Sequence, residues 1–142
     1  MKGLMALVLG GIFVAASIQA AEKVDPRVLG AGRAAYLSYC ASCHGNAGTG
    51  DGPVAESLKT TPPDLTRLTD AKGDFEEARV WTSIDGSHAA SAHGSREMPV
   101  WGKALAKQGR RRGEAWAQAE IWTLIEYLKS IQQAHGEGAE GP

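Results

Sequence analysis

The chain has 142 residues, of which 43% are hydrophobic and 22% are charged, and its formal net charge is −1. This length allows one compact domain with one core, and the composition is that of a soluble globular protein. The balance of 15 basic against 16 acidic side chains excludes an electrostatic argument for a nucleic-acid partner.

The first 20 residues, MKGLMALVLGGIFVAASIQA, differ in character from the rest of the chain. One lysine is followed by an uncharged apolar run and by small residues before a cleavage point after Ala20, which is the layout of a secretory signal peptide. The run also approaches the length of a membrane span, so an uncleaved membrane anchor is the alternative. We expect an exported domain over residues 21–135, followed by a flexible tail over residues 136–142.

A first helix is predicted to begin with Asp25 as its N-cap and Pro26 at its first helical position. Gly45 is expected to end it just past His44, because glycine is the residue most often found after the last helical position. Several residues at helical spacing would share one face of this helix. These are Gly32, Ala35, Tyr36 and Tyr39, with Cys43 along the same stripe.

Both cysteines of the chain lie in the stretch CASCH, in which Cys40 and Cys43 are followed directly by His44. A disulfide here would close too small a loop to stabilise much, and a thioredoxin-like pair would need a βαβ setting that the sequence does not indicate. A structural zinc site would need a second Cys/His pair, and none follows. The fourth interpretation is covalent attachment of a c-type haem, whose motif is C-x-x-C-H.

The chemistry of attachment accounts for this spacing. Positions i and i+3 lie on one face of a helical turn, so Cys40 and Cys43 can both reach the vinyl groups on one edge of a porphyrin. His44, one residue further on, can turn its imidazole toward the iron. We therefore predict one haem c, bound through two thioethers, with His44 as an axial ligand.

From Arg27 onward, and on the strength of this motif, the chain resembles the small monohaem class I cytochrome c family of the bacterial periplasmic type. The resemblance extends over about residues 27–132. It implies an all-α fold in which three main helices and irregular loops surround the haem, and the sequence shows no convincing strand. It further implies a periplasmic, monomeric electron-transfer protein, not an enzyme, whose partners are a donor and an acceptor protein.

The glycine-rich loop after His44 lacks the G-K-[ST] of a phosphate loop and the regular oxygen ligands of a calcium loop. Within it, Gly52-Pro53 resembles the family's G-P step, and the resemblance implies that the Pro53 carbonyl accepts a hydrogen bond from the axial histidine. Pro62 and Pro63, in the stretch PPDLT, would stiffen a loop near the haem edge or form an ordinary surface turn.

A middle helix is predicted from Asp74 to Ile84, and the pair Asp85-Gly86 is a turn signal that would end it. Its expected core positions are Phe75, Ala78, Val80, Trp81 and Ile84.

Met98 is the only methionine beyond the first 20 residues, and it lies in the stretch REMPVWG. This stretch resembles the M-P-x-W-G loop that carries the axial methionine in many family members, and a thioether suits reduced iron. A core-filling methionine is the alternative, although Pro99 and Gly102 indicate a loop. The other candidates for the sixth ligand are His88 and His93, in a stretch rich in Gly, Ala and Ser, and His135 near the C-terminal tail.

Two further features follow Met98. Trp101 would lie against the haem or donate a hydrogen bond to a propionate, and plain burial in the core is the alternative. Arg110, Arg111 and Arg112 form a basic run that is either a solvated cluster or a docking site.

The last helix is predicted from about Glu114 to Gln133. By resemblance, Gly32 and Tyr127 meet where the first and last helices cross, with Tyr36 beside them, because a missing Cβ lets two backbones approach. The apolar stripe of the last helix consists of Ala117, Ile121, Leu124, Leu128 and Ile131, flanked by Trp122 and Ile125.

A haem with both axial positions filled has no open site for a substrate, so we expect a one-electron carrier. One alternative is a cytochrome c subunit of a larger dehydrogenase or oxidase complex. Another is a catalytic protein, in which Met98 would dissociate and the iron would bind peroxide or a small gas.

Overall fold

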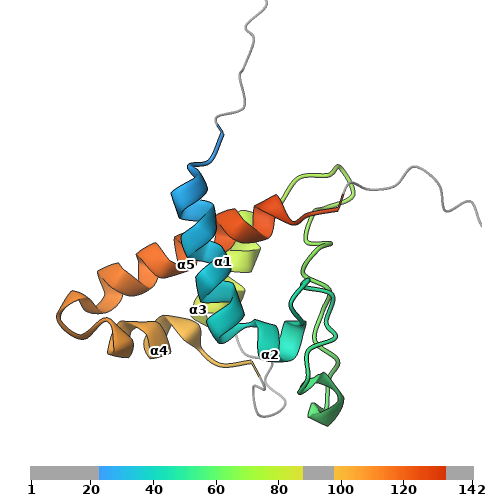
Figure 1. Cartoon of the computed structure of the whole chain (residues 1–142), viewed down its shortest axis with the longest axis horizontal. Helices are drawn as coiled ribbons and strands as arrows, with labels where there is room; N and C mark the ends of the chain where they lie inside the picture. Colours follow the sequence, from blue (N-terminus) through green and yellow to red (C-terminus); the bar gives the residue numbers. More distant parts are fainter. Residues whose placement is uncertain (1–22, 88–97, 134–142) are drawn as a thin grey trace, which may run out of the picture.

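The computed structural model describes residues 23–87 and 98–133, and within these ranges it is helical, without a named strand (Figure 1). The all-α prediction is therefore confirmed. No helix in these ranges is long and apolar enough to cross a membrane. The predicted signal segment, His88, His93 and the predicted tail lie outside the described residues. The elements are α1 (Pro26–Tyr39), α2 (Ala41–His44), the 3-10 helix η1 (Ala55–Ser57), α3 (Glu77–Asp85), α4 (Trp101–Gln108), the 3-10 helix η2 (Arg110–Arg112) and α5 (Gly113–Ser130).

The start of α1 is the predicted one. The Asp25 side chain accepts a hydrogen bond from the backbone N–H of Arg27 at 2.8 Å, and Pro26 is the first helical residue. The predicted single helix to His44 is instead two helices, because the φ of Cys40 is displaced to −115° while its ψ of −35° stays helical, which interrupts the helix before α2. Gly45 ends α2 as expected, with a φ of 80° that favours glycine.

The centre of the fold is the crossing of α1 and α5, the most extensive contact between elements (Figure 1). Gly32 lies so close to α5 that an added Cβ would overlap the Thr123 carbonyl and lie 2.8 Å from the Cβ of Tyr127. Beside this contact the rings of Tyr36 and Tyr127 pack with their centroids 5.3 Å apart. The predicted crossing through Gly32 and Tyr127 is confirmed.

The buried face of α5 supplies much of the core. The helix ends at Ser130, earlier than the predicted Gln133. Trp122, expected beside the stripe, is 44% exposed, because it lies one residue after Ile121 and therefore about 100° around the helix. The buried apolar residues of α5 are Ala117, Ile121, Leu124, Ile125 and Leu128.

The middle helix, α3, begins at Glu77, three residues later than predicted. Before it the chain makes a turn in which the Asp70 side chain accepts hydrogen bonds from the backbone N–H groups of Lys72 and Asp74. Ala78, predicted to be in the core, is exposed, whereas Val80 and Ile84, four residues apart, are buried. Gly86 ends the helix in a left-handed conformation, as the turn signal predicted.

A further helix, α4, was not predicted, and Gly102, which had indicated a loop, lies in its first turn. An added Cβ at Gly102 would lie 2.8 Å from the Asp85 carbonyl oxygen, so this glycine lets α4 approach the end of α3. The buried side chain of Leu105 holds α4 in the core. Together α4, η2 and α5 form a hairpin whose turn lies at the end of α4 opposite Trp101 (Figure 1).

Candidate functional site

Cys40, Cys43 and His44 lie at the junction of α1 and α2. The backbone N–H groups of Cys43 and His44 both donate to the Cys40 carbonyl, at 3.1 and 2.9 Å, so the motif forms one helical turn. Both thiols are free and half-buried, and they are not joined as a disulfide. The two thiols and the imidazole therefore extend from positions i, i+3 and i+4 of one helical turn.

The local environment also bears on the redox and zinc alternatives. Burial, with a smaller contribution from Cys43, raises the pKa of the Cys40 thiol to about 12. A reactive redox cysteine has a lowered pKa instead, because its thiolate is the nucleophile. Within the described ranges, no group of three or more His, Cys, Asp or Glu side chains is arranged to hold a metal ion.

The imidazole of His44 is buried and oriented by one hydrogen bond. Its Nδ1 lies 3.1 Å from the carbonyl oxygen of Pro63, and because a carbonyl can only accept, Nδ1 carries the proton. The lone pair is then on Nε2. Burial lowers the pKa of His44, and the bond to Pro63 opposes this in part. A neutral imidazole with a fixed tautomer is the form that binds a metal.

The acceptor of this bond differs from the expected one, which was the carbonyl of Pro53. Pro53 is exposed, and its two neighbours donate backbone hydrogen bonds to the motif. Gly52 N–H donates to the Cys43 carbonyl and Val54 N–H donates to the Ser42 carbonyl, both at 3.1 Å. An added Cβ at Gly52 would lie 2.6 Å from the Cys43 carbonyl, so only glycine fits here. The step supports the backbone of the motif, not the imidazole.

Sequence reasoning therefore missed the role of Pro63, although it had marked PPDLT as a loop near the haem edge. The signal was present but ambiguous, because two proline-containing loops follow the motif and a surface turn was an equal interpretation. The structure resolves the choice: Pro62 is buried and Pro63 turns its carbonyl toward His44.

Hydrogen bonds also hold the loop that follows the motif. The hydroxyl of Tyr36, a fully buried residue, donates to the Gly45 carbonyl at 2.6 Å, and burial raises the pKa of Tyr36 well above its usual value. Gly50 N–H donates to the His44 carbonyl at 2.9 Å. The backbone on the C-terminal side of the motif is thus tied to α1.

Trp101 lies close to the motif, and Met98 precedes it by three residues. The rings of Tyr39 and Trp101 pack with centroids 5.2 Å apart, and Tyr39 is the residue before Cys40. Met98 and Trp101 are both half-buried against the hydrophobic core. The competing ligand candidates, His88, His93 and His135, lie outside the described residues.

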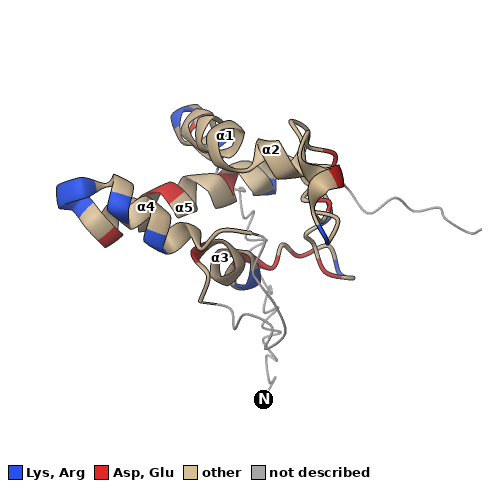
Figure 2. Ribbon diagram, turned by 90° about the horizontal axis from the view of Figure 1, so that it is seen from below, with Lys and Arg blue, Asp and Glu red and all other residues tan. Residues whose placement is uncertain are grey.

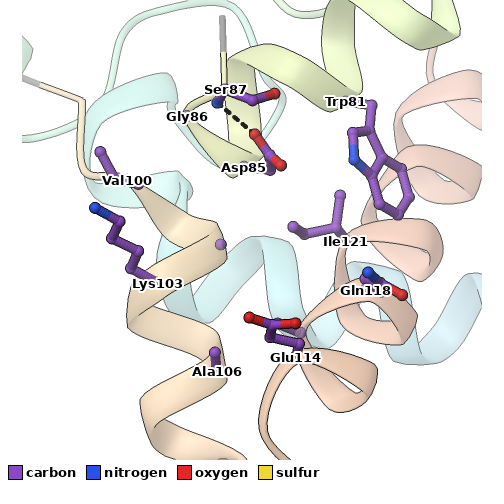
Figure 3. Close-up of a pocket in the computed structure, with 12 residues that line it drawn as sticks. Trp81, Asp85, Gly86, Ser87, Val100, Lys103, Ala106, Glu114, Gln118 and Ile121 are labelled. Atoms are coloured by element: carbon purple, nitrogen blue, oxygen red, sulfur yellow. Dashed lines mark hydrogen bonds between the residues drawn. The ribbon is translucent and has the colours of Figure 1, made fainter.

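A separate cavity of about 340 Å³ lies between α3, α4 and α5 (Figure 3). Trp81 and Ile121 supply its apolar wall, and Lys103 and Glu114 add charged groups from α4 and α5. None of the candidate site residues lines it, so it is distinct from the cysteine–histidine site.

The donor set of this site fits a haem. Two free thiols are available for thioether bonds, and the neutral imidazole presents Nε2 as a ligand. Half-buried apolar side chains lie beside the motif, and an apolar group would gain stability by covering them. Tyr39 precedes Cys40, Trp101 packs on Tyr39, and Met98 lies three residues before Trp101.

A family model described as Cytochrome c matches residues 30–132, a range that contains every candidate site residue. No curated protein and no solved structure matches the chain.

Proposed function

This chain belongs to the cytochrome c family, and we propose that it is a periplasmic one-electron carrier with a single haem c whose axial ligands are His44 and Met98. Family membership supports covalently bound haem and haem-based electron transfer. The chain's one C-x-x-C-H motif supports a single haem, and its N-terminal pattern supports export. Its proposed partners are a donor and an acceptor protein.

The observation that carries the proposal is the arrangement of His44. The Pro63 carbonyl fixes the tautomer, so Nε2 is the ligating nitrogen, and the helical turn through Cys40 and Cys43 places the attachment points directly before it. When bound, the haem supplies a one-electron couple at its iron. The protein must hold the axial ligands with little movement between the two redox states.

Several residues provide that rigidity. Tyr36 ties the end of the motif to α1, and Gly52 packs its backbone against Cys43. Met98 is proposed as the sixth ligand because it is half-buried against the core and leads into Trp101, which packs on the residue before Cys40. A thioether and an imidazole together favour reduced iron more than two imidazoles do.

Optical spectra of the haem-loaded protein in both oxidation states test the ligand set. Wild type should show a low-spin c-type spectrum with a far-red sulfur-to-iron band. Met98→Leu keeps the volume of the side chain but removes the sulfur, so the band should disappear even if the core is undisturbed. His93→Ala is the control and should retain the band.

Two results would contradict the proposal in different ways. A low-spin wild-type spectrum that lacks the band and is unchanged in Met98→Leu would leave Met98 as a core residue and would move the sixth ligand to a histidine. A high-spin spectrum in wild type would indicate an open iron position and would favour the catalytic alternative.

A further inference from the structure

The carboxamide of Gln132, just beyond the end of α5, joins that helix to a distant loop. Its Nε2 donates to the carbonyl oxygens of Leu65 and Leu128, each at 2.8 Å, and its Oε1 accepts from the backbone N–H of Leu68 at 2.7 Å. Both hydrogens and the oxygen of the amide are therefore used. Two of the three bonds connect residues more than 60 positions apart in the sequence.

The loop that Gln132 holds, residues 63–68, is also bound from other sides. Gln133 N–H donates to the carbonyl of the buried Thr66 at 2.9 Å, and Leu65 N–H donates to the Gly48 carbonyl at 2.6 Å. The first residue of this loop is Pro63, the hydrogen-bond acceptor of the His44 imidazole. The end of α5 thus contacts the loop that determines how His44 is oriented.

We propose that Gln132 is a positioning residue for His44, acting through the 63–68 loop. It holds the Pro63 carbonyl at hydrogen-bond distance from Nδ1, and this bond sets the direction and the basicity of the imidazole. The inference rests on the proposed role of His44 as an axial ligand. A looser Pro63 carbonyl makes the imidazole a weaker donor, which destabilises oxidised iron relative to reduced iron and so raises the reduction potential.

The pattern of bonds requires an amide at this position. A glutamate would place a second oxygen against the carbonyls of Leu65 and Leu128, and a methionine of similar length would make none of the three bonds. The adjacent Gln133 is a matched control. It is exposed, and among the described residues it is bonded through its backbone and not through its carboxamide.

The test compares Gln132→Met and Gln132→Glu with Gln133→Met in the haem-loaded full chain. Two quantities are measured: the reduction potential, and the exchange rate of the His44 Nδ1 proton in the reduced protein by NMR. Both Gln132 variants should show faster exchange and a higher potential, whereas Gln133→Met should match wild type. Gly32→Ala weakens the helix crossing without contacting the 63–68 loop, so it lowers the stability of the protein without moving Pro63. It should keep the wild-type reduction potential.

The proposal is overturned if both Gln132 variants keep the wild-type potential and exchange rate, even where they unfold more easily. It is also overturned if Gly32→Ala shifts the potential as much as they do. A wild-type spectrum without His44 ligation would contradict the proposed function alone, because the Nδ1 exchange rates would still show whether Gln132 holds the imidazole.

Discussion

Single hydrogen bonds to backbone carbonyls determine the geometry of the haem motif. His44 donates to Pro63 and Tyr36 donates to Gly45, and both donors belong to buried residues. In the described part of the chain, no buried side-chain nitrogen or oxygen lacks a hydrogen-bond partner. Removing one such partner leaves a buried polar group unpaired, which costs more than the bond itself contributes.

Tyr36→Phe should lower the free energy of unfolding by roughly 0.5–1.5 kcal/mol, because the Gly45 carbonyl loses its shorter hydrogen bond and keeps only the one from Gly48 N–H at 3.3 Å, while the ring stays in place. Urea denaturation of the haem-loaded protein measures this. Tyr127→Phe alters the neighbouring ring in the same way, but at a hydroxyl for which the structure shows no hydrogen bond, and it should stay within about 0.5 kcal/mol of wild type. Equal effects from the two substitutions would show that the Tyr36 bond contributes nothing specific.

Asp64 should make the free energy of unfolding depend on pH in the acid range. Hydrogen bonds from the hydroxyl and the backbone N–H of Thr66, at 2.6 and 2.8 Å, lower the pKa of Asp64, with a smaller contribution from Arg67. A carboxyl whose pKa is lowered in the folded state stabilises the fold at pH values above its unfolded-state pKa of about 3.9. This contribution is lost as the pH falls through the folded-state pKa. The unfolding free energies of wild type and Asp64→Asn, measured from pH 7 to pH 3, should differ most near neutrality and converge in acid. A constant difference over that range would show that ionisation of Asp64 is not involved.

The residue scale also shows what the sequence could reveal about the site. Cys40, Cys43 and His44 were identifiable because the C-x-x-C-H motif places their chemistry in five adjacent residues, and the proposal for Met98 came from its resemblance to a family loop. The His44–Pro63 bond was not, because it joins residues 19 apart through an irregular loop that contains more than one proline. Gln132 gave no signal, since its three bonds arise only when the two ends of the fold meet.

Among the elements, the contact of α1 with α5 determines where everything else can lie. Its geometry depends on a residue without a side chain, because Gly32 faces the Thr123 carbonyl at a distance that no Cβ could share. This made the crossing predictable: a glycine on one helix and an aromatic on the other are a recognisable pair. The contact is rigid, since a backbone carbonyl cannot move aside as a flexible side chain can.

Gly32→Ala should destabilise the protein by roughly 1–3 kcal/mol through overpacking. Gly30→Ala is the matched control, because Gly30 lies on the exposed side of the same helix with nothing within 4 Å of its added Cβ. That substitution should stabilise the protein by about 0.5–1 kcal/mol, since alanine loses less backbone entropy than glycine in a helix. Chemical denaturation of both variants checks the opposite signs, and a destabilised Gly30→Ala would contradict this account.

Other features at this scale show the limit of periodicity. Ala78 was assigned to the core because it is apolar, but it lies two residues before Val80 and so on the opposite side of α3. The helix α4 was hidden by Pro99 and Gly102, which usually indicate loops. In the structure Pro99 precedes the helix and Gly102 enables its close packing on α3. Local sequence preferences predicted the correct fold class, but tertiary contacts determine where these helices begin and which side chains they bury.

For the molecule as a whole, charge is unevenly distributed. Lys103 and Lys107 lie four residues apart on α4, and the three arginines of η2 follow at the turn. Figure 2 shows basic residues along this hairpin. All five cations are exposed, and none forms an ion pair within the described residues. Without them the chain has 10 basic and 16 acidic side chains, a net charge of −6.

This basic side of the hairpin should steer small charged redox reagents, because α4 begins at Trp101 beside the motif and is only about 12 Å long. Reversing three of its charges in Lys107→Glu/Arg111→Glu/Arg112→Glu should slow oxidation by the hexacyanoferrate(III) anion at low salt, on the order of tenfold. Oxidation by a cationic cobalt(III) complex should become faster. Stopped-flow rates at low and high ionic strength measure both, and the differences should fade as salt screens the charges.

The control for this experiment reverses three exposed charges elsewhere, as Arg27→Glu/Arg33→Glu/Lys72→Glu. It changes the net charge by the same amount, so any effect of total charge alone would appear equally in both variants. Equal rates in the two triple variants would show that the basic residues of the hairpin have no specific effect on the approach of the reagents.

The crossing of α1 and α5 also has a consequence for the order of events during biosynthesis. The ribosome makes Cys40, Cys43 and His44 long before it reaches α5, and Gln132 lies 88 positions after His44 in the sequence. A nascent chain that lacks α5 can neither bury Tyr36 against Tyr127 nor hold the 63–68 loop. The attachment motif therefore stays accessible, and the loop that orients its histidine is not held by α5, until α5 has been made.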